Sequence, residues 1–261
     1  MKNETKKRLP GVFLLPNLIT TAALFSGFYA IISSINGFIS VAAIFILVAM
    51  VLDGLDGRIA RLTNTQTSFG EYYDSLSDMI CFGLAPAIII YTWFYSIYNL
   101  NYQGSKVVWI LCFIYVASAA IRLARFNSKI QTQDKKYFVG LASPAAAAVL
   151  ICYAWVIDSS SGFSNPNSEW VGFSLILMPV LSFLMMSNIT YYSFKDFDIR
   201  HKVPHVTLFI IALVISFISF DPPLVLFSFF LLYALSGPSL YILRLIKKKK
   251  TLVPDKKSSK P

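Results

Sequence analysis

Four aspartates occur in one short stretch of the chain, between two strongly apolar segments. Asp53 and Asp56 are spaced i,i+3, and Asp74 and Asp78 are spaced i,i+4. On a helix either spacing puts both side chains of a pair on one face. Two such helices, joined by a short turn at 64–68, would direct all four carboxylates into one cavity. Clustered carboxylates suit hard divalent cations, so the stretch predicts a site for Mg²⁺ or Mn²⁺, with two ions expected.

The chain that carries these acids has the composition of a membrane protein. Of its 261 residues, 56% are hydrophobic and 14% are charged, whereas soluble domains carry about 25% charged residues. An ionised side chain inside a bilayer costs about 2.5–3.5 kcal/mol or more, so acids there indicate a functional site. The formal net charge of +10 does not indicate a nucleic-acid partner, because the basic residues gather at the ends of apolar segments.

Eight apolar segments are long enough to cross a bilayer as helices. Turn-forming residues separate them, such as Asn36-Gly37 and Asp221-Pro222-Pro223. The expected spans are 17–36, 39–62, 70–98, 107–127, 139–158, 169–192, 204–220 and 222–245. We therefore predict an all-α, polytopic membrane helical bundle. A six-span catalytic core is expected over residues 17–195 and two additional C-terminal spans over residues 196–246.

The basic residues predict the orientation of these spans. With eight crossings and a cytoplasmic N-terminus, all of the 23 Lys and Arg residues except Lys106 lie on the cytoplasmic side. Because positive residues favour that side, both termini and the acidic stretch are expected to face the cytoplasm. Residues 1–16 are then a basic cytoplasmic N-terminus. Residues 247–261 are expected to form a disordered, Lys-rich cytoplasmic tail on anionic lipid.

The acidic stretch fits the pattern D-x2-D-G-x2-A-R-x8-G-x3-D-x3-D at every fixed position. Besides the four aspartates, these positions are Gly57, Ala60, Arg61 and Gly70. In this stretch the chain resembles the CDP-alcohol phosphatidyltransferase family. The resemblance implies transfer of a phosphatidyl group from a CDP-linked lipid to an alcohol, with release of CMP.

The resemblance also implies a role for each of these residues. Asp53, Asp56, Asp74 and Asp78 would bind metal, and Asp78 would also act as the general base on the attacking hydroxyl. The physical argument agrees, because cations would have to lie between four carboxylates and a negatively charged diphosphate. The residues expected to contact the nucleotide or the CDP-lipid are Asn17, Leu18, Ile19, Thr20, Gly57, Ala60, Arg61, Thr67 and Gly70.

The acceptor is expected to bind elsewhere. The segments LPNLITTAALFSGFYAI, AIRLARFN, GLASPAAAA and SNITYYSFK resemble bacterial membrane-type members of the family that use L-serine. This resemblance implies CDP-diacylglycerol as donor, L-serine as acceptor and a homodimer in the bacterial inner membrane. Candidate contacts to the serine are Arg122, Arg125, Asn127, Tyr191 and Lys195.

Two other functions stay open at this point. The same chemistry could use glycerol 3-phosphate or an inositol phosphate, since the basic residues between Arg122 and Lys136 could bind a phosphorylated acceptor. The acids could instead line the ion path of a cation transporter or channel. That function predicts acids spread through the depth of the membrane, whereas spans one, five, seven and eight carry almost no charge.

Several of these residues also have a purely structural interpretation. Arg122 and Arg125 could only anchor the end of a span at the membrane surface. Thr67 and the residues Asn17–Thr20 could simply cap helices. An acid could pair with Arg58 or Arg61 to hold two helices together. For four aspartates in one motif we favour the metal site.

Overall fold

The computed structural model describes residues 14–98, 102–129, 137–160, 168–192, 212–213 and 216–251. Its long elements are helices: α1 (Leu14–Ile35), α2 (Ile39–Leu62), α3 (Ser68–Asp78), α4 (Ala85–Tyr98), α5 (Tyr102–Lys129), α6 (Ser143–Ser160), α7 (Ser168–Met186) and α9 (Pro222–Thr251). A π-helical segment, η1 (Met79–Leu84), joins α3 to α4. Two short strands, β1 (Tyr137–Val139) and β2 (Thr190–Tyr192), pair antiparallel.

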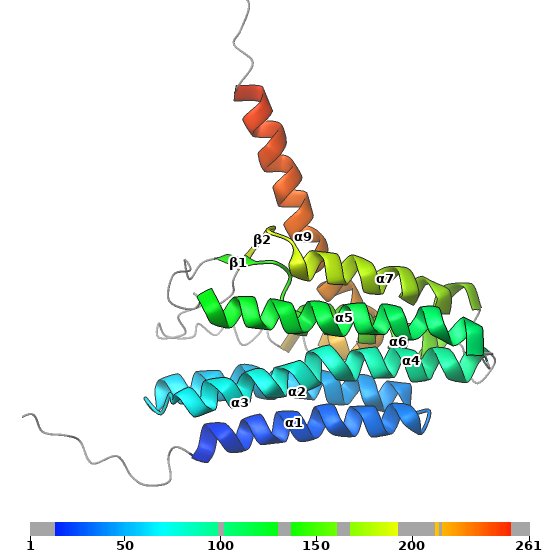
Figure 1. The fold of residues 1–261 in the computed structure, drawn as a ribbon, viewed down its shortest axis with the longest axis horizontal. Helices are drawn as coiled ribbons and strands as arrows, with labels where there is room; N and C mark the ends of the chain where they lie inside the picture. The colour runs from blue at the N-terminus through cyan, green and yellow to red at the C-terminus, as the bar shows by residue number, and fades with distance from the viewer. Residues whose placement is uncertain are drawn as a thin grey trace, which may run out of the picture.

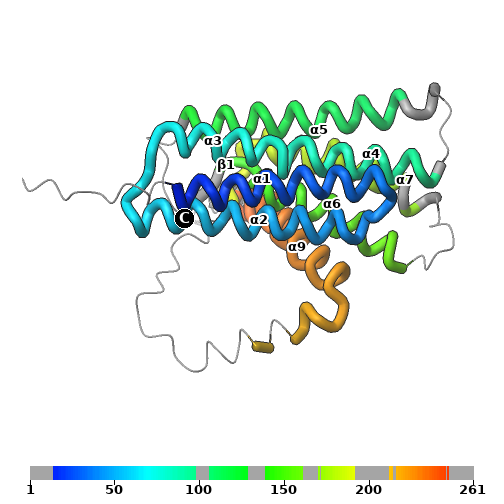
Figure 2. Tube along the Cα trace, turned by 90° about the horizontal axis from the view of Figure 1, so that it is seen from below, coloured from blue at the N-terminus to red at the C-terminus, as the bar shows by residue number. Residues whose placement is uncertain are grey.

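Helices α1 to α7 run side by side as one bundle (Figure 1). The view from below shows α3 and α4 as one continuous rod that lies between α1 and α5 (Figure 2). Helix α9 runs across the bundle, and its C-terminal end projects away from it (Figure 1). Helices α1 and α2 form a hairpin whose turn contains Gly37 with φ +83°, a conformation that glycine adopts without strain.

Six helices of the described part are long and apolar enough to cross a membrane. They are Leu14–Ile35, Ile39–Leu62, Ser68–Ile97, Lys106–Ser128, Ser143–Ser160 and Pro222–Arg244. Many large apolar side chains on them are exposed, for example Phe25, Phe113 and Leu232. Such surface is stable in lipid and not in water. The chain is therefore a multi-pass integral membrane protein.

The predicted arrangement of six core spans followed by two C-terminal spans is wrong. Helix α9 does not lie apart from the first six spans but packs against α6 of the bundle. The rings of Tyr153 on α6 and Phe227 on α9 lie 5.6 Å apart. Helix α6 has neighbours on several sides because the small, buried residues Ala145–Ala148 let other helices approach closely. The segments 204–211 and 214–215 of the expected seventh span, and the expected boundary after residue 195, lie outside the described residues.

Two span boundaries also differ from the prediction, and for a common reason. The expected spans 139–158 and 169–192 include residues that pair as β1 and β2, so the all-α prediction missed this small sheet. Gly140 has φ +82°, and a Cβ there would collide with the carbonyl oxygen of Met185. The backbone of Leu141 then donates to Leu184 at 3.0 Å. Close backbone contact between the two segments therefore delays the start of α6 and ends α7 early.

Candidate active site

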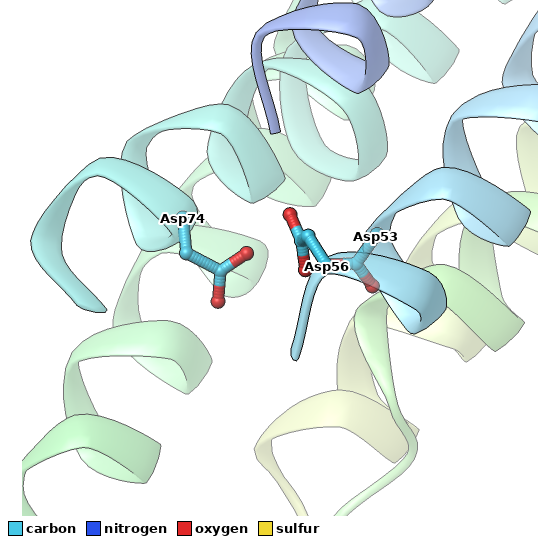
Figure 3. A group of neighbouring side chains, drawn as sticks. All are labelled: Asp53, Asp56 and Asp74. Carbon is cyan, nitrogen blue, oxygen red and sulfur yellow. The ribbon is translucent and has the colours of Figure 1, made fainter. Parts of the chain in front are cut away.

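Three of the four predicted metal ligands form one group between helices α2 and α3. Asp53 and Asp56 come from the last turns of α2 and Asp74 comes from α3. Figure 3 shows their carboxylates directed toward one another across the space between the two helices. One carboxylate oxygen of each lies within 4.8 Å of the others. The fourth, Asp78, lines the same cavity from the end of α3.

The burial and the hydrogen bonding of these carboxylates fit a bound cation. Among the described residues no hydrogen-bond donor reaches Asp74 Oδ1, although that atom is buried. A buried oxygen without a donor is unfavourable unless a cation satisfies it. Asp56 is 4% exposed, and the hydroxyl of Thr20 on α1 donates to its Oδ2 at 2.5 Å. The group formed by Asp53, Asp56 and Asp74 could therefore hold a divalent metal ion.

A cavity of about 370 Å³ opens beside the acids. Its walls come from α1, α2, the turn after α2, α3 and α5. The predicted site residues on these walls are Asn17, Thr20, Asp53, Asp56, Gly57, Ala60, Arg61, Thr67, Gly70, Asp74 and Asp78. Of the predicted nucleotide contacts, Leu18 and Ile19 are not on the walls, and Leu18 is 66% exposed. The helical repeat explains this, since residues 18 and 19 lie on other faces of α1 than Asn17 and Thr20.

Small residues shape the cavity in two different ways. A Cβ at Gly57 would meet no atom within 4 Å, so its space belongs to the cavity. A Cβ at Gly70 would lie 3.2 Å from Thr67 Oγ1 and 3.3 Å from Asn17 Oδ1. Thr67 is the N-cap of α3, because its hydroxyl oxygen accepts a hydrogen bond from the Gly70 backbone N–H at 3.0 Å. Thr67 therefore has a structural role at the start of the acid-bearing helix.

Sequence reasoning missed several residues of the cavity wall. They are Pro16, Gly54, Thr65, Gln66, Glu71 and Phe126. Glu71 precedes Asp74 by three residues, so helical spacing alone could have identified it. Thr65 and Gln66 lie in the turn that joins the two acid-bearing helices. Phe126 reaches the cavity from α5, and no local pattern signals this.

The predicted acceptor contacts that the structure describes do not line the cavity. Arg122 is 8% exposed and lies close enough to Asp78 for their charges to interact. Its Nη1 donates to Ser143 Oγ at 2.9 Å, while its Nε has no hydrogen-bond partner among the described residues. Arg125 donates to the Met186 carbonyl at 3.2 Å and to Asn188 Oδ1.

Two further acceptor candidates are engaged in other contacts. Asn127 donates from Nδ2 to Ser75 Oγ on α3 at 2.9 Å. Tyr191 on β2 is fully buried, and its hydroxyl donates to the Ala234 carbonyl of α9 at 3.1 Å. Burial raises the pKa of Tyr191 above its ordinary value, so the hydroxyl stays a donor. The fifth candidate, Lys195, lies outside the described residues.

Comparison with known proteins agrees with this geometry. Residues 13–180 match the family model described as CDP-alcohol phosphatidyltransferase. A CDP-diacylglycerol–serine O-phosphatidyltransferase of Helicobacter pylori (strain ATCC 700392 / 26695) is 38% identical over 90% of this chain and 94% of its own length. An archaetidylserine synthase of Methanothermobacter thermautotrophicus is 34% identical over 71% of this chain and 72% of its own. A Saccharomyces cerevisiae CDP-diacylglycerol–serine O-phosphatidyltransferase is 34% identical over 58% of this chain and 57% of its own. The chain belongs to the CDP-alcohol phosphatidyltransferase family, as the spacing of its aspartates predicted.

Proposed function

We propose that this protein transfers the phosphatidyl group of CDP-diacylglycerol to the hydroxyl of L-serine, giving phosphatidylserine and CMP. The observation that carries the proposal is a cavity of about 370 Å³ with the Asp53, Asp56 and Asp74 carboxylates on its wall, in a membrane protein. The 38% identity to a serine O-phosphatidyltransferase along almost the whole chain supports L-serine as the acceptor.

The acid group provides the binding site for the donor's diphosphate through divalent cations, Mg²⁺ or Mn²⁺. Asp53, Asp56 and Asp74 would hold the metal, and Asp78 is available from the same wall for a second ion. When bound, the metal neutralises negative charge on the diphosphate and on the leaving CMP. Without it, the carboxylates would repel the donor.

Asp78 acts as the general base in this scheme. The serine hydroxyl oxygen bonds to the phosphorus that carries the diacylglycerol, and the bond from that phosphorus to CMP breaks. The proton of the hydroxyl passes to the Asp78 carboxylate. Asp78 suits this role because it lies at the cavity wall and outside the group of three aspartates that gather most closely.

The nucleotide occupies the part of the cavity next to α1 and α2. Gly57 leaves open space there, and Arg61 is an exposed guanidinium at the rim whose Nε donates to the Gly57 carbonyl at 3.0 Å. Its remaining N–H groups can form paired hydrogen bonds with phosphate. Asn17 and Thr20 contribute polar groups from α1.

The serine carboxylate binds next to Asp78, where Arg122 has an Nε without a partner among the described residues. Arg125 with Asn188 extends this polar region toward α7. Asn127 and Tyr191 do not contact the serine directly in this proposal, because their polar groups already donate hydrogen bonds to α3 and α9. Glycerol 3-phosphate and inositol phosphates carry a phosphate group and would need more cationic groups than serine, and the acceptor screen described below distinguishes them from serine.

The positive residues at the ends of the helices support an orientation with both termini in the cytoplasm and the cavity open to that side. The bacterial inner membrane is the location that agrees with this orientation and with the bacterial relatives. The Lys-rich residues 247–261 would then contact anionic lipid head groups. A homodimer is expected for the family.

The direct test is an acceptor screen with purified protein, CDP-diacylglycerol and Mn²⁺ or Mg²⁺. CMP release is measured with L-serine, glycerol 3-phosphate and inositol 1-phosphate in parallel. Turnover with serine alone supports the proposal, and turnover only with a phosphorylated alcohol contradicts it. The Asp78→Asn variant should release no CMP with any acceptor. If it instead retained CMP release, Asp78 would not be the base.

A further inference from the structure

The helix that carries Asp74 and Asp78 does not continue as an α-helix beyond the acids. Directly after Asp78 the backbone forms the six-residue π-helical segment η1, in which the N–H of Ala85 donates to the Ile80 carbonyl. A π-turn contains one residue more than an α-turn and is frequent at functional sites. It rotates the helix after it relative to the helix before it. The direction of the acids is therefore set independently of the packing of α4.

The sequence gives a reason for this segment. Residue 86 is proline, so it has no N–H to donate to the carbonyl of Phe82 four residues earlier. In a regular α-helix its ring would also collide with that carbonyl. The wider π-turn avoids the collision, but the Phe82 carbonyl still lacks its α-helical donor. Phe82 is 1% exposed, so water does not replace that donor.

Tyr115 on α5 donates to this carbonyl. Its hydroxyl lies 3.1 Å from the Phe82 oxygen, and its side chain is 0% exposed. A buried tyrosine hydroxyl needs a partner, and a buried carbonyl without its usual donor needs a replacement. The one hydrogen bond satisfies both groups. It also links η1 to a different helix of the bundle.

Helix α5 also donates a hydrogen bond to the residues that precede Asp78. Asn127 donates to Ser75, three residues before Asp78, and Tyr115 donates to Phe82, four residues after it. Asp78 therefore lies between two cross-helix hydrogen bonds that both come from α5. No contact of this kind appears in the family motif, whose fixed positions all lie on α2 and α3.

We propose that Tyr115 is a positioning residue for the acid cluster. By holding the Phe82 carbonyl, it fixes the π-turn that sets Asp74 and Asp78 opposite Asp53 and Asp56. The inference rests on the proposed metal-binding role of the aspartates. It predicts that loss of the Tyr115 hydroxyl weakens metal binding, although this side chain touches neither the metal ligands nor the substrates.

The test uses the full-length protein, purified in detergent, and its Tyr115→Phe variant. Binding of Mn²⁺ alone is measured by electron paramagnetic resonance, without CDP-diacylglycerol or serine. The variant keeps the ring and removes the hydroxyl, and we expect about fivefold weaker Mn²⁺ binding, the equivalent of one net hydrogen bond. In turnover assays kcat falls at a fixed low Mn²⁺ concentration, while the KM for serine stays within about twofold, because no serine contact is lost.

Tyr153→Phe is the matched control. Tyr153 also donates from a largely buried hydroxyl to a backbone carbonyl, that of Trp170 at 2.5 Å, but it lies on α6 away from the cavity. The thermal unfolding temperature should fall by a similar amount in both variants. Only Tyr115→Phe should lose Mn²⁺ affinity. Wild-type Mn²⁺ affinity in Tyr115→Phe would overturn the proposal.

A second pair of variants tests the link to the proline. Pro86→Ala restores an N–H that can donate to Phe82, so the hydroxyl of Tyr115 becomes less necessary. In the Pro86→Ala background, Tyr115→Phe should change Mn²⁺ affinity by less than about twofold. An equal fivefold loss in both backgrounds would overturn the proposed link. This double variant also provides a folded protein for the comparison if Tyr115→Phe alone does not fold.

The Asp53→Asn variant separates this inference from the proposed function. If Asp53→Asn binds Mn²⁺ as the wild type does, the aspartates are not the metal site and both proposals fail. If Asp53→Asn loses Mn²⁺ binding while Tyr115→Phe does not, only the role of Tyr115 is refuted. Serine-dependent CMP release by the wild type is measured separately and tests the activity itself.

Discussion

At two places in the described part of this molecule a proline removes a helical hydrogen-bond donor and a buried tyrosine replaces it. The first lies beside the acid cluster, where Pro86 leaves the Phe82 carbonyl without its α-helical donor and Tyr115 donates at 3.1 Å. There the backbone also widens into the π-helical segment η1. The proline therefore changes the rotation of the helix directly after Asp78.

The second place is in α9, where Pro238 lies within the helix. Pro238 cannot donate to the Ala234 carbonyl, and the Tyr191 hydroxyl donates to it at 3.1 Å. The Tyr191 ring lies against Gly237, where a Cβ would be 2.5 Å from a ring carbon. No π-turn accompanies this proline, and α9 continues as an α-helix to Thr251.

The same local chemistry thus has different consequences at the two places. Beside the acids, the tyrosine bond acts on residues that the proposed reaction needs, so a change there should alter metal binding and turnover. At α9 it joins the two-stranded β1–β2 sheet to that helix, so a change there should alter stability. The following predictions test this difference.

The largest effect is expected for Asp74→Asn at the acid cluster. The amide oxygen is a weak metal ligand, so CMP release should fall by about 100-fold or more. Stability should not fall, because a buried carboxylate oxygen without a donor is removed. Turnover and thermal unfolding are measured on the same preparation. Asp158→Asn, which changes an acid on α6 bonded to Ser40, is the control and should keep activity within about twofold.

Gly237→Ala should have the largest effect on stability. The new methyl group would collide with the Tyr191 ring, and such overpacking costs about 1–3 kcal/mol. Thermal unfolding in detergent measures the loss, and kcat per folded molecule should stay unchanged. A variant as stable as the wild type would show that the Tyr191 ring has room to move.

Gly57→Leu tests a glycine that borders open space, in contrast to Gly237, which packs against a ring. A Cβ at Gly57 meets no atom within 4 Å, so the side chain extends into the cavity without strain in the helix. We expect about tenfold weaker binding of CDP-diacylglycerol, equivalent to about 1.4 kcal/mol, with no loss of stability. The KM for the donor and the unfolding temperature are the two measurements. A destabilised variant with an unchanged donor KM would contradict this assignment.

Tyr191→Phe should have the smallest of these effects. It removes one buried hydrogen bond to Ala234, which is worth about 1 kcal/mol. Mn²⁺ affinity should equal that of the wild type, in contrast to Tyr115→Phe. The KM for serine is measured in the same experiment. A rise in that KM would show that Tyr191 also acts on the acceptor, as its sequence position suggested.

The sequence predicted the features that depend on short-range spacing or on composition. The i,i+3 and i,i+4 pairs of aspartates share helix faces because the helical repeat alone determines this. The apolar helices α1, α2, α5 and α6 lie close to their predicted positions, because the length of an apolar segment decides whether it can span a bilayer. Thr67 as a cap also follows from its position before α3.

Contacts between distant segments account for what the sequence did not predict. The strands β1 and β2 are three residues long and continue apolar segments, so their pairing gives no periodic signal. The packing of α9 onto α6, which replaced the expected division into six and two spans, depends on the shapes of two helix surfaces. The hydrogen bond from Asn127 to Ser75 depends on how α5 is rotated relative to α3.

The amino-acid sequence by itself determined that this is a membrane protein with a metal-binding motif of one family, because both properties are encoded locally. Only the tertiary structure decided which side chains surround that motif. Phe126, Arg122 and Tyr115 come from α5, and their relation to the acids depends on the register between helices. That register results from the packing of whole side-chain surfaces, which no short stretch of residues specifies.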